Sequence, residues 1–337
     1  MKLKDPKLVI QAAPFLKQGL TTPQAMLDVI YALIPITIAS IWFFGISVLF
    51  VLMASIAGAV ATEWLFSKAS HRGESLRDGS AMLTGLLLGL TLPPSLPLWM
   101  AFIGGVVGIG LGKTIWGGLG NNLFNPALLG RAFLLANFPN AMTTWTAGSS
   151  GFFDLHASHF AIPFMQSDVD AVTSATPLGL MKFEQQETPW LDLIIGSTPG
   201  SFGETCGLLI ILSGIYLILR RSIDWRIPAA ILTTVVIFSG LLFQFDSTRF
   251  PDPLFAVFSG GLLLGTFFMA TDPVTSPLTP KGAWLFGIGI GIIVVLIRVF
   301  GGFPEGVMYA ILLMNATVPL IERYTQPRAF GRGEPAK

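Results

Sequence analysis

The sequence predicts an all-α integral membrane protein with about ten transmembrane helices, arranged as two inverted five-helix repeats. Of its 337 residues, 52% are hydrophobic and only 12% are charged, which is about half the charged fraction of a soluble domain. Apolar stretches close to the roughly 20 residues that a bilayer requires recur along the chain. Glycine-rich motifs of the first half also return in the same order in the second half.

The first membrane half is expected to cover residues 1–138. It opens with a basic segment over 1–22. Five apolar spans are then predicted, at about 25–43, 45–66, 78–93, 97–114 and 125–138. The third span is short because Pro93 and Pro94 end it. The fourth is rich in glycine, which lets neighbouring helices approach closely.

Residues 139–204 form the only long polar interval and are expected to make a loop on one side of the membrane. The second membrane half follows over 205–322, and a polar tail covers 323–337. Five spans are predicted in this half, at about 205–219, 227–244, 254–270, 283–300 and 305–322. The span at 254–270 is interrupted at its end by Asp272-Pro273, much as Pro93-Pro94 interrupts the third span.

Three sequence matches between the two halves support the predicted internal repeat. GLLLG at 85–89 recurs at 261–265, and GIGLG at 108–112 recurs as GIGIG at 287–291. A Gly-Gly pair precedes the fifth span and another precedes the tenth. Equivalent elements are therefore five spans apart. An odd number of crossings turns the second copy over, which predicts an inverted repeat.

The cationic residues predict the orientation. Sixteen lysines and arginines fall on the side of the N-terminus, whereas only Lys182 and Arg249 fall on the other side. Positive charge marks the cytoplasmic face, so both termini are expected in the cytoplasm and the 139–204 loop on the outer face.

Composition also excludes several classes of site. The single Cys206 rules out an intrachain disulfide and a cysteine-ligated iron–sulfur cluster. The three histidines show no metal-ligand spacing, so no metal site is expected. A net charge of +1 predicts no nucleic-acid partner.

Acidic residues within or beside the spans are candidates for ion movement, because a charge inside the bilayer is costly. Asp78 opens the third span, Asp272 closes the eighth, and Glu305 and Glu322 flank the tenth. Helix capping is the alternative for Asp78 and Glu305, and an interfacial position is the alternative for Glu322. Asp272 is the strongest candidate, since paired interrupted spans often mark a site near the membrane midplane.

Asn122 and Asn125 open the fifth span, and Arg131 follows about a turn and a half later. Amides at a helix start could bind an uncharged heteroaromatic ring such as a flavin or a quinone. The alternative is that they are capping and turn residues. Arg131 could pair with an anionic cofactor group or reach back to the cytoplasmic interface.

Four motifs suggest a family: RGESLRDG at 72–79, NLFNPALLGRAF at 122–133, TSATPL at 173–178 and FMATDPV at 268–274. In these segments, which are spread over both halves, the chain resembles the RnfD/NqrB family, which includes the D subunits of Rnf-type ion-translocating oxidoreductases. That family also includes, more distantly, the B subunits of the sodium-pumping NADH:quinone oxidoreductase. The length favours the RnfD branch, because the B subunits carry a longer N-terminal extension.

The resemblance implies a urea-transporter-like fold and FMN joined through a phosphoester to Thr176. Ser174 stands where the family motif has glycine, and it is small enough for the same turn. A second, non-covalent riboflavin is expected near Asn122 and Asn125. Asp272 and Glu322 match acidic positions that the family links to cation movement.

The expected function is that of an electron-transfer subunit, inactive alone, in a bacterial inner-membrane complex. That complex would link reduced ferredoxin and NADH and couple electron flow to Na⁺ or H⁺ transport. Expected partners are the lipid bilayer, the A, B, C, E and G subunits of the Rnf complex, and a flavin transferase that loads Thr176. Two alternatives stay open: the quinone-reducing B subunit, and a urea- or ammonium-type channel or transporter, which would have no use for a flavin on Thr176.

Overall fold

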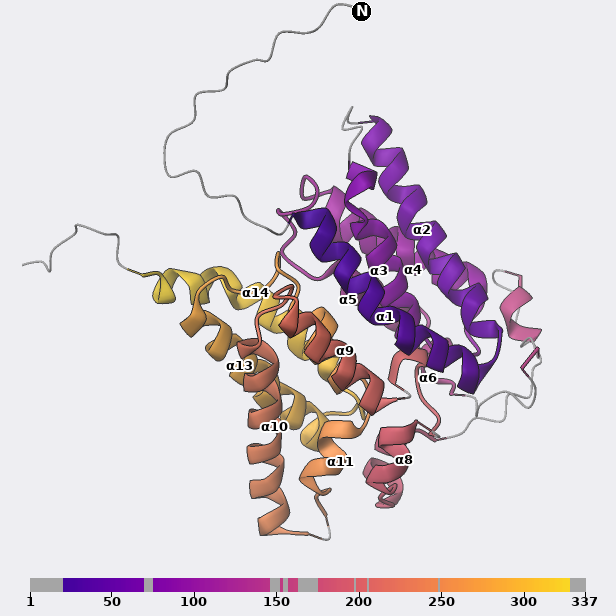
Figure 1. The fold of residues 1–337 in the computed structure, drawn as a ribbon. Coiled ribbons are helices and arrows are strands. Elements are labelled where there is room, and N and C mark those ends of the chain that lie inside the picture. Colours follow the sequence, from indigo (N-terminus) through magenta and orange to yellow (C-terminus); the bar gives the residue numbers. More distant parts are fainter. Residues whose placement is uncertain are drawn as a thin grey trace, which may run out of the picture.

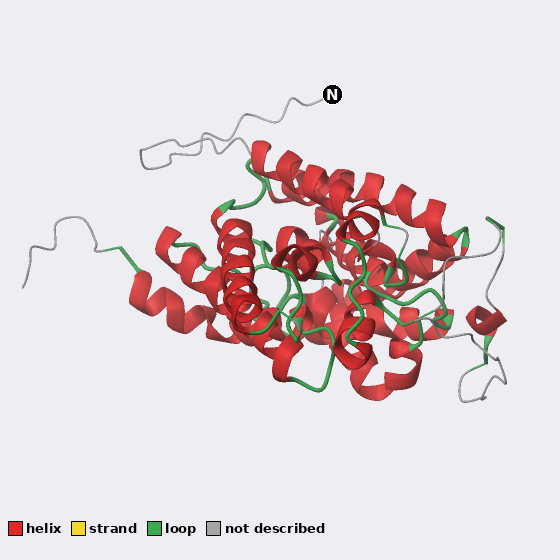
Figure 2. Ribbon diagram, turned by 90° about the horizontal axis from the view of Figure 1, so that it is seen from below, coloured by secondary structure: helices red, strands yellow, loops and turns green. Residues whose placement is uncertain are grey.

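A computed structural model describes residues 21–69, 75–145, 152–153, 157–162, 175–196, 198–204, 206–247 and 249–327. Within these ranges all regular secondary structure is helical (Figure 2). Four helices in this part of the chain are long and apolar enough to cross a membrane: α1 (Thr22–Phe44), α2 (Ser47–Ala69), α10 (Arg226–Phe245) and α13 (Pro280–Phe300). The protein is therefore a multi-pass membrane protein.

The other predicted spans coincide with further helices, most of them shorter. These are α3 (Ser80–Leu90), α4 (Leu98–Ile109) with its π-helical extension η2 (Gly110–Thr114), α5 (Pro126–Asn137), α9 (Gly207–Leu219) and α14 (Val307–Thr325). Pro93 and Pro94 follow the end of α3, as expected from the sequence. A bilayer crossing by all ten segments stays a prediction.

The eighth predicted span is broken in its interior. It consists of α11 (Pro253–Phe258), a turn at Ser259–Gly261, then α12 (Leu262–Leu264) and the π-helical η6 (Gly265–Met269). Gly260 has φ +64°, a conformation that glycine adopts without strain. Arg298 of α13 donates to the carbonyl oxygens of Ala256, in the last turn of α11, and Ser259, so its guanidinium satisfies carbonyls at the break.

The two halves of the chain lie side by side, with α1–α5 in one group and α9–α14 in the other (Figure 1). In the first group α2 packs on α4, and in the second α10 packs on α13. The inverted repeat requires this same pairing in both halves, but the repeat itself stays a prediction. Helix α1 packs on α9, and α5 on α14, so these helices join the groups.

The glycines of the GIGLG and GIGIG motifs do not occupy matching contacts. Gly287 and Gly291 leave room for α10, at Ala230 and Thr234, whereas Gly108 and Gly112 approach Pro126 of α5. The close approach to α2 is made instead by Gly105, where a Cβ would collide with the Ser55 carbonyl oxygen. The packing therefore does not keep the register of this sequence match.

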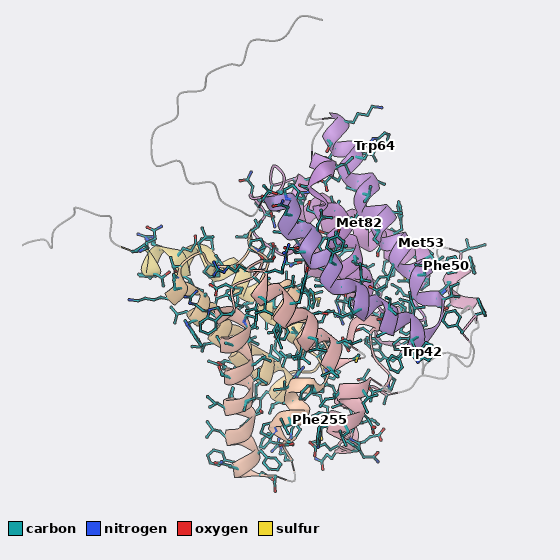
Figure 3. All side chains as sticks on the ribbon, in the orientation of Figure 1. Trp42, Phe50, Met53, Trp64, Met82 and Phe255 are labelled. Atoms are coloured by element: carbon teal, nitrogen blue, oxygen red, sulfur yellow. The ribbon has the colours of Figure 1, made fainter. Side chains whose placement is uncertain are left out.

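Large apolar side chains cover the outside of α1 and α2. Trp42, Met53 and Trp64 project outward (Figure 3) and are 78%, 48% and 51% exposed. A soluble monomer rarely exposes such a surface, whereas lipid tails accept it. The burial pattern thus agrees with the membrane class that the composition indicates.

Two cavities at the ends of the short helices

Two cavities lie at opposite ends of the short helix α3. Ser80, at the start of α3, lines one of them, which we call the Asn122 cavity. The other end of α3 meets η5 (Phe202–Glu204), whose Glu204 lines the second, the Thr176 cavity. With 11 residues in α3, the two ends are about 16 Å apart.

The Asn122 cavity has a volume of about 60 Å³, and residues from both halves line it. Its polar side chains are Ser80, Thr84, Lys113, Asn122, Asn125, Ser222, Thr271 and Asp272. Leu83, Leu87, Phe267 and Phe268 contribute apolar walls. Apolar walls with a few convergent polar groups are typical of the lining of a small-molecule site. The structure therefore brings together three residues that the sequence singled out separately, Asn122, Asn125 and Asp272.

Asn125 is both a helix cap and a link between the halves. Its Oδ1 accepts from the backbone N–H groups of Ala127 and Leu128 at 3.0 and 3.3 Å, and its Nδ2 donates to the Met269 carbonyl at 3.1 Å. The Asn315 amide, oriented to satisfy both its neighbours, accepts from Asn125 N–H at 3.1 Å and donates to the Thr275 carbonyl at 3.2 Å. Asn125 is therefore a helix-capping residue, which was one of the two interpretations of the sequence, and its side chain also lines the cavity.

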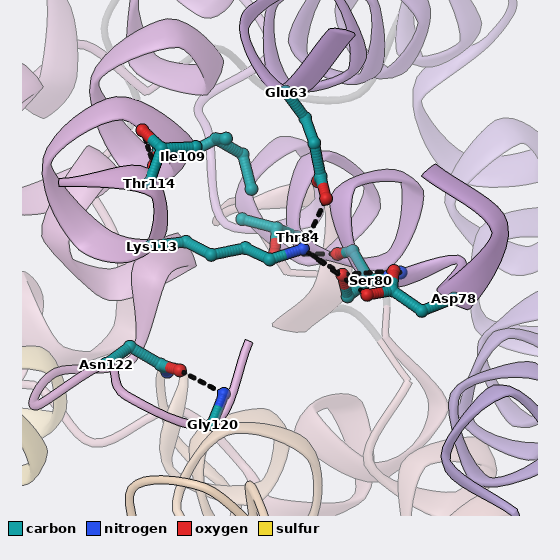
Figure 4. A network of polar contacts seen from close by, with 9 residues as sticks. All are labelled: Glu63, Asp78, Ser80, Thr84, Ile109, Lys113, Thr114, Gly120 and Asn122. Carbon is teal, nitrogen blue, oxygen red and sulfur yellow. Dashed lines mark hydrogen bonds and ion pairs between the residues drawn. The ribbon is translucent and has the colours of Figure 1, made fainter. Parts of the chain in front are cut away.

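Lys113 forms a buried ionic network at one wall of this cavity (Figure 4). Its Nζ donates to Glu63 Oε1 at 2.6 Å and to Ser80 Oγ, and it lies 3.6 Å from Asp78 Oδ2. Asp78 Oδ1 in turn accepts from Ser80 N–H and Oγ–H at 2.8 and 2.6 Å. The predicted ion-pathway residue Asp78 therefore caps the start of α3 and also faces a buried cation.

Sequence reasoning missed Lys113 and Glu63 as site residues. Their side chains are only 2% and 1% exposed, and such burial of charge is tolerated when the two groups are paired. The available signal was an ionisable residue inside each of two apolar spans, 45–66 and 97–114.

The two remaining acidic candidates have different environments. Asp272 lines the Asn122 cavity; its Oδ2 accepts from Thr275 Oγ1 at 3.1 Å, and burial raises the pKa of its carboxyl. Glu322 lies near the end of α14, where its Oε1 accepts from Leu278 N–H at 3.1 Å. It lines neither of the two cavities, so the structure does not bring it together with Asp272.

Thr176 stands at the start of a helical segment made of α7 (Pro177–Gly179) and η4 (Leu180–Glu184). Its Oγ1 accepts from Gly179 N–H at 3.2 Å, the usual contact of an N-cap threonine. The hydroxyl-bearing side chain lines a cavity of about 40 Å³ together with Trp145, Phe258, Glu204 and Glu305. Ser174 lies outside the described residues.

Arg131 belongs to this second region rather than to the Asn122 cavity. Its Nη2 lies 2.8 Å from Glu305 Oε2, and Glu305 Oε1 accepts from Gly261 N–H at 3.0 Å. The guanidinium, only partly exposed, is paired with a carboxylate of the other half, and its predicted pairing with an anionic cofactor group stays a prediction. Burial and the neighbouring Glu305 raise the pKa of Glu204 to about 7, although Arg131 opposes this.

A larger cavity of about 290 Å³ adjoins the Thr176 cavity and shares Leu178 and Pro304 with it. Its cationic groups are Lys182, Arg249 and Arg298. Lys182 Nζ donates to the carbonyl oxygens of Arg298, Gly301 and Phe303, and burial lowers the pKa of its amine. Positive groups and apolar walls beside Thr176 suit an anionic aromatic group.

Comparison with known proteins decides the family. The model of the NQR2, RnfD, RnfE family matches residues 9–331, which is nearly the whole chain. The chain belongs to this family. The resemblance that the four sequence motifs indicated is thereby confirmed.

Among the relatives, the D subunit of the proton-translocating ferredoxin:NAD(+) oxidoreductase complex of Clostridium ljungdahlii is 40% identical, covering 98% of each chain. The D subunit of the ion-translocating oxidoreductase complex of Stutzerimonas stutzeri is 42% identical over 93% of each chain. The D subunit of the Na(+)-translocating ferredoxin:NAD(+) oxidoreductase complex of Acetobacterium woodii is 39% identical over 98% of this chain and 97% of its own. All three are D subunits, which agrees with the branch that the chain length favoured.

Proposed function

We propose that this protein is the membrane electron-transfer subunit of a cation-translocating ferredoxin:NAD oxidoreductase complex, with FMN attached through its phosphate to Thr176. The observation that carries the proposal is the position of Thr176: its hydroxyl caps a helix and lines a cavity in a chain that matches a D subunit over nearly its full length. The protein acts only within its complex, whose other members are the A, B, C, E and G subunits.

The surroundings of Thr176 fit a phosphoester. Helix N-termini favour negative charge because their first N–H groups point outward and the helix dipole is positive there. The Thr176 cavity and the adjoining cavity of about 290 Å³ offer room beside this residue, with Lys182 and Arg249 as nearby cations. When bound, FMN supplies the one-electron and two-electron chemistry that no side chain of this protein provides. A covalent bond keeps the cofactor in place on the outer face, where a dissociated flavin could not be replaced.

The Asn122 cavity is our proposed site for a second, non-covalent flavin, riboflavin. Asn122 and Asn125 line it with amides that suit an uncharged ring, beside the apolar walls of Leu83, Leu87 and Phe267. Asp272 opens onto the same space, which places a candidate for Na⁺ or H⁺ binding next to a candidate redox group. At this proximity a charge on the redox group would act directly on the ion site.

The orientation is part of the proposal. The distribution of lysine and arginine supports cytoplasmic termini and an outer-face Thr176 segment in a bacterial inner membrane. The Asn122 cavity is then at the cytoplasmic end of the short helices. FMN is attached by a separate flavin transferase that works on the outer face.

Covalent flavin is tested by producing the protein together with a flavin transferase and measuring in-gel fluorescence after denaturation. Thr176→Val should abolish the fluorescence, and mass spectrometry should find one added FMN on the peptide that contains Thr176. Thr198→Val is the matched control, because Thr198 lines the same cavity and should leave the label unchanged. An unlabelled native peptide, or a label retained by Thr176→Val, would refute the assignment. A protein without any flavin would leave the channel or transporter alternative.

A further inference from the structure

Two carboxyl groups meet at Gly261, in the break of the eighth span. A Cβ built on Gly261 would lie 2.6 Å from Glu305 Oε1 and 3.1 Å from Glu204 Oε1. The two oxygens therefore approach the same small space, which exists because residue 261 has no side chain. Glu204 and Glu305 both also line the Thr176 cavity.

The carboxyl oxygens of Glu204 and Glu305 differ in their hydrogen-bond partners. Glu305 uses Oε2 for Arg131 and Oε1 for Gly261 N–H. Glu204 Oε1 is fully occluded and, within the described part of the chain, has no hydrogen-bond partner. A buried acceptor without a donor is costly. A proton on Glu204 removes that cost, because its O–H can then donate toward Glu305.

The nearby arginines do not neutralise a second negative charge on this pair of carboxyls. Arg131, from α5, is held by Glu305. Arg298, from α13, attracts both carboxylates electrostatically. Its Nη groups, however, donate to the carbonyl oxygens of Ala256 and Ser259. Two adjacent carboxylates in a buried site cannot both ionise readily. Burial and Glu305 accordingly raise the pKa of Glu204 to about 7, where a small change in local charge alters its protonation.

We propose that Glu204 and Glu305 form a proton-binding site that responds to the redox state of the flavin on Thr176. An electron arriving on that flavin adds negative charge beside the pair. One proton then moves from water onto the Glu204 carboxylate, giving a neutral carboxyl that donates to Glu305 Oε1. When the electron leaves, the proton returns to water. This inference rests on the proposed function for its redox partner, but not for the proton site itself.

Infrared spectroscopy of the intact, flavin-loaded complex tests both parts. In a pH titration, the C=O stretch of a protonated carboxyl should be present at mildly acidic pH and disappear with a midpoint of about 7. In a reduced-minus-oxidised difference spectrum near neutral pH, the same band should increase. Glu204→Gln should remove the band from both experiments. Glu184→Gln, which changes an exposed carboxylate of η4, should leave it unchanged.

A second variant keeps every charge. Gly261→Ala places a methyl group in the space that the two oxygens share, so it should shift the midpoint of the carboxyl band without changing the net charge. An unaltered midpoint in Gly261→Ala, or a band retained by Glu204→Gln, would overturn the proton site. A band that titrates with pH but ignores reduction in a flavin-loaded complex would overturn the redox link. A complex without covalent flavin would defeat the proposed function, and the pH titration would still decide whether the pair binds a proton.

Discussion

The buried cation of the Asn122 cavity gives a prediction whose size follows from its contacts. Lys113→Met keeps a long apolar side chain but removes the charge that Glu63 contacts at 2.6 Å and Asp78 faces at 3.6 Å. Lys113 and Glu63 are 2% and 1% exposed, so water cannot replace the lost partner. Removing one member of such a pair costs about 3–5 kcal/mol, because the other charge stays buried.

The assay is thermal denaturation of the detergent-solubilised protein, followed by tryptophan fluorescence. At about 2 °C for each kcal/mol in a large chain, Lys113→Met should lower the midpoint by about 6–10 °C. Lys281→Met is the matched control, because Lys281 is exposed at the start of α13 and surface changes usually stay within about 0.5 kcal/mol.

The double variant Glu63→Leu/Lys113→Met separates pairing from simple loss of contacts. Removing both charges leaves Asp78 with its bonds from Ser80 and should recover most of the lost stability. The reasoning is refuted if Lys113→Met behaves like Lys281→Met, or if the double variant loses as much as the two single changes combined.

Three further predictions concern the other polar groups. Asp272→Asn should lower cation transport by the reconstituted complex several-fold while its flavin content is unchanged. The control Asp224→Asn, at a partly exposed ion pair, should change neither quantity. If Asp272→Asn transports cations as well as the native protein, Asp272 is not part of the ion path. Asn125→Ala should cost about 1–2 kcal/mol through loss of the cap. Asn125→Asp should lose at least as much in the same denaturation assay, because it keeps the cap acceptor but turns a buried carboxylate oxygen toward the Met269 carbonyl. The folded-state pKa of Glu204 is raised from 4.5 to about 7, so the folded protein holds a proton that the unfolded chain releases between these values. Stability relative to Glu204→Gln should therefore fall as pH rises through this interval and level off above it, and a flat difference would contradict the raised pKa.

The positions of the helices could largely be predicted from the sequence. Each predicted span coincides with helical structure, and the short third span ends before Pro93 as expected. The interior break of the eighth span could not be predicted from the sequence. Its turn at Ser259–Gly261 looks like any small-residue stretch in an apolar helix, and the side chain that satisfies it, Arg298, comes from a different helix.

Parts of the candidate sites were also predictable. Asn122, Asn125 and Asp272 were identified from local features, namely amides at a helix start and an acid at a helix end, and they line one cavity. Arg131 was singled out because it follows Asn125 by about a turn and a half, but its protein partner was not predicted. The structure pairs it with Glu305, 174 residues away, since a helix directs residues six positions apart toward different neighbours.

The sequence by itself determined the membrane class, the helical segments and the family, because hydrophobic length, helix breakers and motifs are local properties of the chain. Only the tertiary structure decided which charges neutralise one another: Lys113 with Glu63, and Arg131 with Glu305. It also decided that Glu204 lies beside Glu305 at the wall of the Thr176 cavity. The physical reason is that the energy of a buried charge depends on distances between segments far apart in the chain, and these distances are set by packing rather than by sequence spacing.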